Sequence, residues 1–390
     1  MSATHRGTLL GLASVVALVT LPVTPAAAEL GPHGHARHRV CATSAAGSAA
    51  CHAQVVDNAA TGRPLASTSW TNGYSAQQLQ KVYNGQIGNA GPGTLVAVVD
   101  AYANPNAAAD LAAYRARFGL GPANLTQIGG DGRGINRIRG DVGWGQEEML
   151  DLEMVSALCP SCSILYVGAR SASFTDLAAA VTTAKNRGAR VISNSYGANE
   201  FSAETSLTQW NVPGVAVTVS SGDSGYGVQF PAASAGVVAV GGTTLTLNTD
   251  GTRRSETVWS GAGSGCSAYI RKPSWQTDTG CTRRTVADVA AVADPDTGVA
   301  VYDSYGSTGG ANWYVFGGTS VAAPIVGALY ARNGVPSDPV AQSLYTNSAG
   351  LYDVSGGSNG TCSAAYLCTG GTGYDGPTGN GAPNGVAAPF

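Results

Sequence analysis

The chain has 390 residues, enough for one large core or for two to three ordinary domains, and 54 of the residues are glycine. Only 12% of the residues are charged and the net charge is −3, which excludes the strongly basic surface that nucleic acid binding requires. Protonation of carboxylates at acid pH breaks ion pairs and so lowers stability. Because so few residues are charged, this chain has few ion pairs to lose, and its composition is compatible with acidic surroundings.

The first 28 residues have the pattern of a secretory signal peptide. His5 and Arg6 precede an apolar stretch over residues 9–21, and an alanine triplet ends at Ala28. Because this stretch is too short to span a membrane comfortably, we expect cleavage after residue 28 and secretion of the chain, with no membrane anchor.

Eight cysteines fit an exported protein, and they lie in the sequence as four pairs of neighbours. Local disulfides are the simplest pairing, although the sequence alone leaves the connectivity open. The pairs are Cys41 with Cys51, Cys159 with Cys162, Cys266 with Cys281, and Cys362 with Cys368. The second pair also matches the redox C-x-x-C pattern, but the even count in an exported chain favours a structural bridge.

Residues 29–73 have little apolar periodicity, and we interpret them as a short prosegment or N-terminal extension. From residue 74 onward, short apolar segments recur at regular intervals along the sequence. We therefore expect one domain over residues 74–390.

Short strands that are apolar on both faces alternate with helices in this domain, which is typical of a parallel sheet covered on two sides. The strands are expected at residues 94–99, 163–167, 190–193, 215–220 and 237–240, the helices near 106–118, 145–155 and 174–186, and an added hairpin at 243–247 and 253–258. Three polar residues directly follow strands, namely Asp100, Asn194 and Asp223. They are candidates to line one cleft at the carboxyl edge of the sheet.

The helix expected over residues 145–155 carries a pair of carboxylates. Glu147 and Asp151 are four residues apart, so their side chains lie on one face and can share a proton. Glu148 is the competing partner, three residues from Asp151. The plain alternative is an acidic pair that the helix N-terminus tolerates at small cost.

The segment from Ser221 to Gly225 looks like the nucleophile loop of trypsin-like proteases, an interpretation that fails without a histidine. Its aspartate, Asp223, is then either a turn residue between two glycines or a functional acid. As a functional acid it would stay protonated and donate a hydrogen bond to an oxyanion.

A glycine-rich turn delivers Ser320 to the start of an apolar helix expected over residues 321–331. At that place the hydroxyl lies beside free backbone N–H groups and the positive end of the helix dipole, as a serine nucleophile requires. The alternative is that Thr319 or Ser320 only caps the helix. All five histidines lie within the first 52 residues, so the base for Ser320 should be a carboxylate, and neither a Ser-His-Asp triad nor a His-ligated zinc site is expected.

Taken together, these motifs resemble the sedolisin family, the serine-carboxyl peptidases that share the subtilisin fold. The similar motifs are the start of the catalytic domain at residues 73–79, the Glu-x-x-x-Asp pair of Glu147 and Asp151, the oxyanion aspartate in residues 221–223, and the nucleophile motif at 317–320 with Pro324. The resemblance implies an α/β fold, a subtilisin-like three-layer sandwich with a mostly parallel central sheet flanked by helices.

The resemblance also implies a function, that of a secreted, monomeric serine-carboxyl endopeptidase. Such an enzyme hydrolyses peptides or unfolded proteins through an acyl-enzyme and is most active at acid pH. Ser320 would be the nucleophile, Glu147 the base that Asp151 orients, and Asp223 the oxyanion donor. An extended substrate would bind along the strand edge formed by Ser193, Asn194, Ser195, Tyr196 and Gly197. The alternative function is a catalytically weak or inactive secreted peptide-binding protein on the same scaffold.

A glycine-rich stretch near the C-terminus resembles the calcium loop of the family. By that resemblance, one structural Ca²⁺ would be held by the carboxylates of Asp353 and Asp375, by the carbonyls of Val354, Gly371 and Gly373, and by water. From the residues alone, the same stretch is a glycine-rich surface loop. Family members usually carry a large folded prodomain, so the short segment over residues 29–73 leads us to expect either maturation without one or a different use of the catalytic groups.

Overall fold

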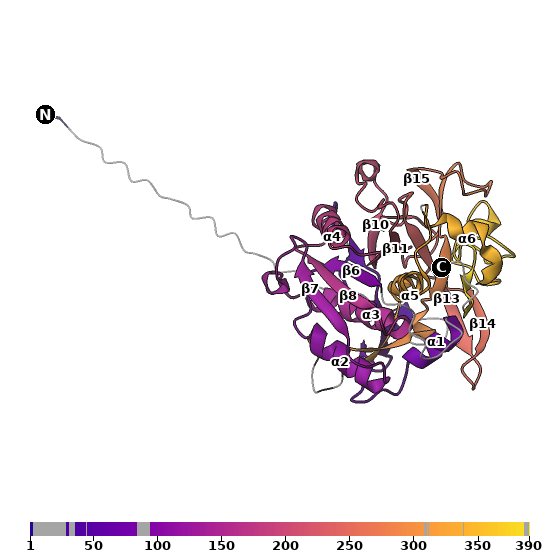
Figure 1. Ribbon diagram of the computed structural model, residues 1–390. Helices are drawn as coiled ribbons and strands as arrows, with labels where there is room; N and C mark the ends of the chain where they lie inside the picture. Colours follow the sequence, from indigo (N-terminus) through magenta and orange to yellow (C-terminus); the bar gives the residue numbers. More distant parts are fainter. Residues whose placement is uncertain are drawn as a thin grey trace.

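Figure 1 shows the chain as a computed structural model, which describes residues 1–2, 29–30, 36–43, 45–83, 94–307, 310, 312–337, 339–385 and 390. Nearly all of the expected signal peptide, residues 3–28, lies outside the described residues. Within the described parts, no helix has the length and apolar character needed to cross a membrane.

The centre of the fold is an eight-stranded sheet in the order β14-β13-β11-β9-β6-β8-β7, with β17 paired to β13. Its strands are β6 (Leu95–Ala101), β7 (Asn124–Gly129), β8 (Ser163–Ala169), β9 (Val191–Asn194), β11 (Ala216–Ser220), β13 (Val238–Leu247), β14 (Arg253–Val258) and β17 (Val289–Val292). Every pairing is parallel except that of β13 with β14, which a short turn joins as an antiparallel hairpin. The mostly parallel sheet is as expected.

The two faces of the sheet belong to two separate cores. In β6, Val96 and Val98 point into the first core, and Ala97 and Val99 point into the second. The first core is completed by α1 (Ala76–Tyr83), α2 (Ala107–Arg117), α3 (Val142–Leu158) and α5 (Thr319–Asn333), and the second by α4 (Phe174–Asn186). This arrangement confirms the three-layer sandwich (Figure 1).

One strand is longer than expected. Residues 237–240 and 243–247 were expected as separate elements, but they belong to the single strand β13 across Gly241 and Gly242. These glycines serve close packing and not a turn: a Cβ on Gly241 would lie 1.9 Å from the Pro377 carbonyl oxygen.

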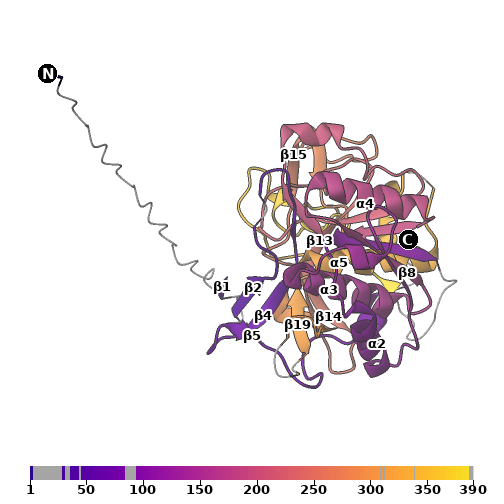
Figure 2. The same ribbon diagram turned by 90° about the vertical axis from the view of Figure 1, so that its left-hand side faces the viewer.

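Residues 36–43 and 45–66 are built into the same body. β2 (Ala36–Arg39), β4 (Gln54–Asn58), β19 (Trp313–Gly317) and β18 (Val299–Tyr302) form one antiparallel sheet, and Figure 2 shows β2, β4 and β19 side by side. β3 (Ala50–Cys51) pairs with β10 (Tyr196–Asn199). The strand pairings therefore connect residues on both sides of residue 73. The sequence did not indicate these pairings, because strands of two to five residues are too short for their periodicity to stand out.

Smaller strands and four disulfides complete the fold. The remaining strands are β1 (Glu29–Leu30), β5 (Arg63–Pro64), β12 (Gln229–Phe230), β15 (Gly265–Arg271), β16 (Arg283–Val286), β20 (Leu351–Tyr352) and β21 (Ala382–Pro383), and a short helix, α6, spans Gln342–Thr346. The disulfides join the neighbouring cysteines, as expected: Cys41 to Cys51, Cys159 to Cys162, Cys266 to Cys281, and Cys362 to Cys368.

Candidate active site

Ser320 lies in the first turn of α5, directly after β19 and Gly318. Gly318 has a φ of 103°, and a Cβ there would lie 1.9 Å from the carbonyl oxygen of His52, so the turn requires glycine. Gly318 is also the N-cap residue of the helix, which removes the interpretation of Thr319 or Ser320 as a cap. The Ser320 side chain is fully buried, and its hydroxyl makes a long contact of 3.3 Å with the Ser195 carbonyl.

The carboxylates of Glu147 and Asp151 lie on one face of α3, fully buried. Oε2 of Glu147 accepts the backbone N–H of Ala53 at 2.8 Å, while Oε1 has no hydrogen-bond partner among the described residues. The Ser320 hydroxyl lies near enough to lower the pKa of Glu147, so a small rotation would let it donate to this carboxylate. Asp151 accepts the hydroxyl of Ser195 on both oxygens, at 2.8 and 2.7 Å.

A third carboxyl, that of Asp100, lies beside this pair. Burial raises the pKa of Asp100 to about 8, and within the described part of the chain neither of its oxygens has a hydrogen-bond partner. Burial, followed by repulsion from Asp100, raises the pKa of Glu147 and of Asp151 well above their usual values. Three neighbouring carboxyls in a dry site cannot all be ionised, so the group keeps a proton that its members can exchange.

Glu148, the competing partner, points elsewhere. Its carboxylate accepts the backbone N–H of Asn104 at 2.6 Å and the side-chain amide of Gln127 at 3.2 Å. One residue along a helix rotates the side chain by about 100°, which is why Glu147 and not Glu148 shares a face with Asp151.

Asp223 lies beyond the carboxyl end of β11 and contacts the start of α5. Its Oδ1 accepts both the N–H and the hydroxyl of Thr319, at 2.8 and 2.7 Å, and its Oδ2 accepts the side-chain amide of Gln54 at 3.1 Å. Burial raises the pKa of Asp223, and the guanidinium of Arg39 opposes that rise. A carboxyl held in this way keeps its proton to a higher pH than an exposed aspartate does.

Asn194, the third residue expected at the strand ends, has a structural role. Its amide donates to the carbonyls of Ile192 and Thr218, and its oxygen accepts the Tyr196 hydroxyl at 2.7 Å. Ser193 likewise lies inside the sheet, in β9. Neither residue is placed to bind a substrate backbone.

The other three residues of the expected binding edge are Ser195, Tyr196 and Gly197, and they pair with residues 50–52 of the same chain. Tyr196 and Gly197 pair antiparallel with Cys51 and Ala50, and the Ser195 carbonyl accepts the N–H of His52 at 3.1 Å. The edge therefore receives an extended backbone directly beside Ser320.

The site also contains a histidine, although none was expected. The ring of His52 contacts the Ser220 hydroxyl through Nδ1 at 2.6 Å and Oε1 of Gln229 through Nε2 at 2.7 Å. Neither nitrogen is bonded to Ser320 or to its carboxylates, so among the described residues this ring forms no Ser-His-Asp triad. Sequence reasoning missed it because residue 52 was placed outside the domain.

The residues of the expected calcium loop lie together. The Asp353 carboxylate accepts the N–H of Gly373 at 3.0 and 3.2 Å, and Asp375 accepts the N–H of Gly371 at 3.1 Å. Val354 adjoins Asp353 and is fully buried. In the described ranges no three His, Cys, Asp or Glu side chains gather as a metal site, so any cation here would rest on two carboxylates and on main-chain oxygens.

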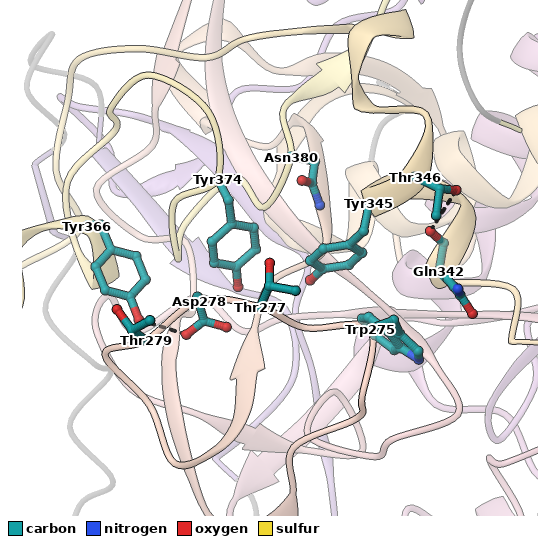
Figure 3. Close-up of a pocket in the computed structure, with 10 residues that line it drawn as sticks. All are labelled: Trp275, Thr277, Asp278, Thr279, Gln342, Tyr345, Thr346, Tyr366, Tyr374 and Asn380. Carbon is teal, nitrogen blue, oxygen red and sulfur yellow. Dashed lines mark hydrogen bonds between the residues drawn. The ribbon is translucent and has the colours of Figure 1, made fainter.

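A pocket of about 520 Å³ lies apart from these residues, between the chain after β15 and α6 (Figure 3). Its lining is mixed aromatic and polar: Trp275, Thr277, Asp278, Thr279, Gln342, Tyr345, Thr346, Tyr366, Tyr374 and Asn380. It contains neither Ser320 nor any of the carboxylates around it.

The chain is similar to known peptidases in sequence and in structure. Residues 129–354 match the Subtilase family, Peptidase_S8. Kumamolisin from Bacillus sp. (strain MN-32) is 31% identical over 356 residues, which cover 80% of this chain and 62% of kumamolisin. Sedolisin from Pseudomonas sp. (strain 101) is 34% identical over 200 residues, or 43% of this chain and 33% of that protein.

A solved structure of Pseudomonas sedolisin, described as a serine-carboxyl proteinase complexed with two molecules of pseudo-iodotyrostatin, superimposes with a TM-score of 0.68 at 27% identity. The match covers 81% of this chain and 96% of that one. The chain spans less than two thirds of the length of the curated relatives.

Proposed function

Because the chain belongs to the subtilase family and, within it, to the sedolisins, we propose that it is a serine-carboxyl endopeptidase with Ser320, Glu147 and Asp151 as its triad. The observation that carries this proposal is the placement of one backbone amide. The N–H of Ala53 donates to Glu147 while the residues before it lie along β10 beside Ser320. A leaving amine needs this position relative to its general acid.

In the proposed reaction, Glu147 takes the proton of Ser320 as the hydroxyl attacks a peptide carbonyl, and then returns it to the leaving amine. Asp151 shares the proton of the carboxyl group and holds Ser195 in place. Protonated Asp223 and the backbone N–H of Ser320 donate to the tetrahedral oxyanion. All four groups are present and buried, which disfavours the inactive peptide-binding alternative.

We also propose that the enzyme is secreted and acts at acid pH. All eight cysteines form disulfides, as suits an oxidising compartment. Burial raises the pKa of Asp223, so the protonated form that donates to the oxyanion persists through the acid range.

Digestion of an unfolded protein at about pH 4 and pH 7 tests the proposal, because an ordinary aspartate titrates near the lower of these values. We expect faster cleavage at the lower pH, and none by the Ser320→Ala variant at either. Cleavage that survives the removal of Ser320 would rule out the assigned nucleophile.

Asp223→Asn is expected to lower kcat about 10²- to 10³-fold and to flatten the alkaline limb of the pH profile. Asp223 donates only while protonated, so wild-type activity falls as the pH rises through its pKa, which burial has raised. Asparagine donates at every pH. The measurement is kcat against pH for both proteins, and an unchanged alkaline limb would remove Asp223 from the mechanism.

We propose a structural Ca²⁺ at Asp353 and Asp375. Asp353 contacts Gly373 and Asp375 contacts Gly371, so two carboxylates lie in one glycine-rich loop beside main-chain carbonyls, and these are the oxygen ligands that Ca²⁺ prefers. The residues present therefore fit the ion.

A chelator is expected to lower the melting temperature by about 3 to 4 °C, since removing an ion held at 100 times its dissociation constant costs about 2.7 kcal/mol. Thermal unfolding with and without chelator measures this effect. The Asp353→Asn variant is the control, because it should melt at the same temperature in both conditions. A wild-type protein indifferent to the chelator would contradict the assignment.

A further inference from the structure

We propose that the pocket between the chain after β15 and α6 (Figure 3) is a binding site for a neutral oligosaccharide of β-linked, glucose-type pyranose units. The pocket contains neither Ser320 nor the carboxylates around it, so this binding goes beyond the proposed peptidase function. Three features of the pocket point to such a ligand: a row of aromatic rings, charges that cancel in pairs beside it, and a rim of amides and hydroxyls.

The pocket is rich in aromatic side chains. Its volume of about 520 Å³ lies within the range of about 300–1,000 Å³ that is typical of small-molecule sites. Four of its ten lining residues are aromatic, namely Trp275, Tyr345, Tyr374 and Tyr366, whereas aromatic residues make up 7% of the whole chain. Each of the four is only partly buried, so the filling of a core does not account for them.

The four rings form a row. The distance between ring centroids is 4.8 Å from Trp275 to Tyr345, 5.7 Å from Tyr345 to Tyr374 and 6.3 Å from Tyr374 to Tyr366. Figure 3 shows all four side chains pointing into the pocket. The face of an aromatic ring is electron-rich, so a row of such rings attracts a ligand surface made of C–H groups, which carry a small positive charge.

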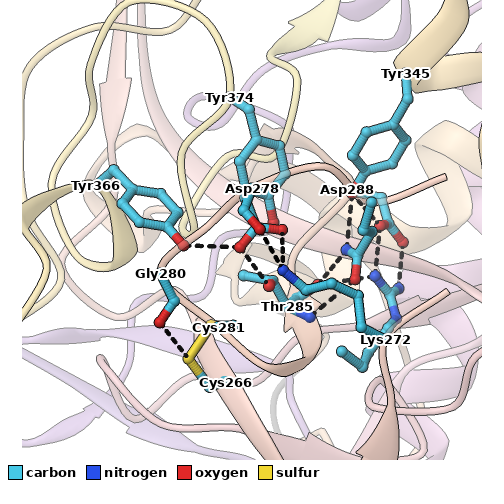
Figure 4. Close-up of polar contacts among 12 residues, drawn as sticks. Cys266, Lys272, Asp278, Gly280, Cys281, Thr285, Asp288, Tyr345, Tyr366 and Tyr374 are labelled. Atoms are coloured by element: carbon cyan, nitrogen blue, oxygen red, sulfur yellow. Dashed lines mark hydrogen bonds and ion pairs between the residues drawn. A yellow bond between two sulfur atoms is a disulfide. The ribbon is translucent and has the colours of Figure 1, made fainter. Parts of the chain in front are cut away.

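The tyrosine hydroxyls of the row are bonded to the protein itself. Each donates to a different acceptor: Tyr345 to Asp288 at 2.7 Å, Tyr366 to Asp278 at 2.7 Å, and Tyr374 to the Ala287 carbonyl at 3.0 Å. Figure 4 shows the first two of these bonds. Because the hydroxyls are engaged, the rings offer their carbon surfaces to a ligand.

The walls of the pocket are preformed. The disulfide between Cys266 and Cys281 closes the loop that carries Trp275. At one end of this loop Gly280 lies against Tyr366, where a Cβ would be 2.4 Å from the hydroxyl oxygen. A ligand therefore finds the rings in place and loses little free energy to ordering them.

The charged groups beside the pocket cancel in pairs. Lys272 forms an ion pair with Asp278 at 2.8 Å. Arg284 binds both carboxylate oxygens of Asp288, at 2.7 and 2.5 Å. Because the Arg284 guanidinium already lies 5.4 Å from the centre of the Trp275 ring, it would repel a second cation on this row, and an anion would have to displace a carboxylate from its partner. The pocket therefore favours an uncharged ligand.

Amides and hydroxyls surround the row of rings. The amides belong to Gln342 and Asn380, and the hydroxyls to the exposed residues Thr277, Thr279 and Thr346. Each of these side chains can both donate and accept a hydrogen bond. The hydroxyl groups of a sugar do the same, so this rim offers them partners in either direction.

A β-linked chain of glucose-type units complements both the row and the rim. All ring substituents of such a unit are equatorial, so its two faces consist of C–H groups and its hydroxyls lie at the edge. The β-linkage extends the units into a flat ribbon that can lie along the row. A proline-rich peptide also binds aromatic rows, but proline has no N–H, so the accepting oxygens of the rim would then lack donors.

Isothermal titration of the full chain with cellohexaose and with N-acetylchitohexaose tests the site, since both are neutral ribbons of glucose-type units. We expect at least one of them to bind at a single site. The Trp275→Ala variant should bind it about 10- to 100-fold more weakly, the scale on which loss of an aromatic anchor acts. Gln342→Leu keeps the size of the side chain but removes its amide, and should weaken binding about 3- to 10-fold.

Tyr269→Ala is the matched control, because it removes an aromatic side chain from the same hairpin but outside the pocket. Tyr269 lies in β15 and is 37% exposed. This variant should bind the oligosaccharide with wild-type affinity. Thermal unfolding checks that each variant is folded, and all three should cleave a short peptide at the wild-type rate, since the pocket holds none of the catalytic groups.

Decaproline is titrated in parallel. A folded wild-type chain that binds neither oligosaccharide, or that binds decaproline in their place, overturns the inference. Oligosaccharide binding that survives in Trp275→Ala, or that is as strong in Gln342→Leu as in the wild type, overturns it as well. If Trp275→Ala does not fold, the Gln342→Leu variant decides. Peptide cleavage is a separate readout, so the inference and the proposed function can fail independently.

Discussion

Replacing Glu147 with glutamine is expected to lower kcat/KM for peptide cleavage by about four orders of magnitude, the scale on which loss of a triad base acts. Glutamine has nearly the same shape and can still accept the N–H of Ala53, so binding of the chain along β10 should persist. It cannot take a proton from Ser320. The loss should therefore appear in kcat, measured by single-turnover cleavage of a peptide.

The same variant should not unfold more easily. The pKa of Glu147 is raised in the folded state, so its ionisation costs stability as the pH rises above the ordinary glutamate value. As the pH falls to the ordinary glutamate value the unfolded chain also takes up a proton here, so this cost disappears. Glu147→Gln should consequently match the wild type in urea unfolding at about pH 4 and exceed it at about pH 7, values that bracket this window.

Glu148→Gln is the matched control, since it makes the same change one residue away in the same helix. Its carboxylate contacts Asn104 and Gln127 and not Ser320, so kcat should stay within about threefold of the wild type. If the two variants lose activity equally, Glu147 has no special role and the loss reflects damage to α3.

The different positions of the Glu147 and Glu148 side chains were partly predictable from the sequence. Four-residue spacing on one helix fixes Glu147 and Asp151 on a common face, whatever the rest of the chain does. Likewise, parallel strands bring their carboxyl ends to one edge, which is why Asp100 and Asp223 were candidates to line one cleft. Both rules are local or depend only on topology, and both hold in the structure.

The contacts that the N-terminal residues 52–54 make with the site were not predictable in this way. Ala53 contacts Glu147 across 94 positions of sequence, and Gln54 contacts Asp223 across 169. Strands as short as β3 have no periodicity of their own, and only the partner strand β10 makes them strands. His52 could have been flagged by a simpler signal, as a lone histidine next to a cysteine and followed by the apolar pair Val55 and Val56.

Outside the catalytic groups, the largest effect is expected from Arg284→Ala, which should destabilise the fold by about 3–5 kcal/mol at neutral pH. Arg284 and Asp288 are both fully buried, and the guanidinium binds both carboxylate oxygens, at 2.7 and 2.5 Å. Asp288 also accepts the Tyr345 hydroxyl (Figure 4). It accepts the N–H of Ala239 as well. Without the arginine, an ionised carboxylate would be left inside the protein with neutral donors only.

The dependence on pH separates this cause from a simple cavity. Without Arg284, protonating Asp288 removes the buried charge, so the destabilisation should shrink as the pH falls toward about 4, whereas the cost of a cavity would not change. Replacing Arg284 with methionine and Asp288 with asparagine together should recover part of the loss, because no unpaired charge then remains. Urea unfolding at both pH values measures all three proteins. If Arg284→Ala lowers the free energy of unfolding equally at both pH values, the role of Arg284 is packing beneath the pocket of Trp275 and Tyr345 and not charge neutralisation.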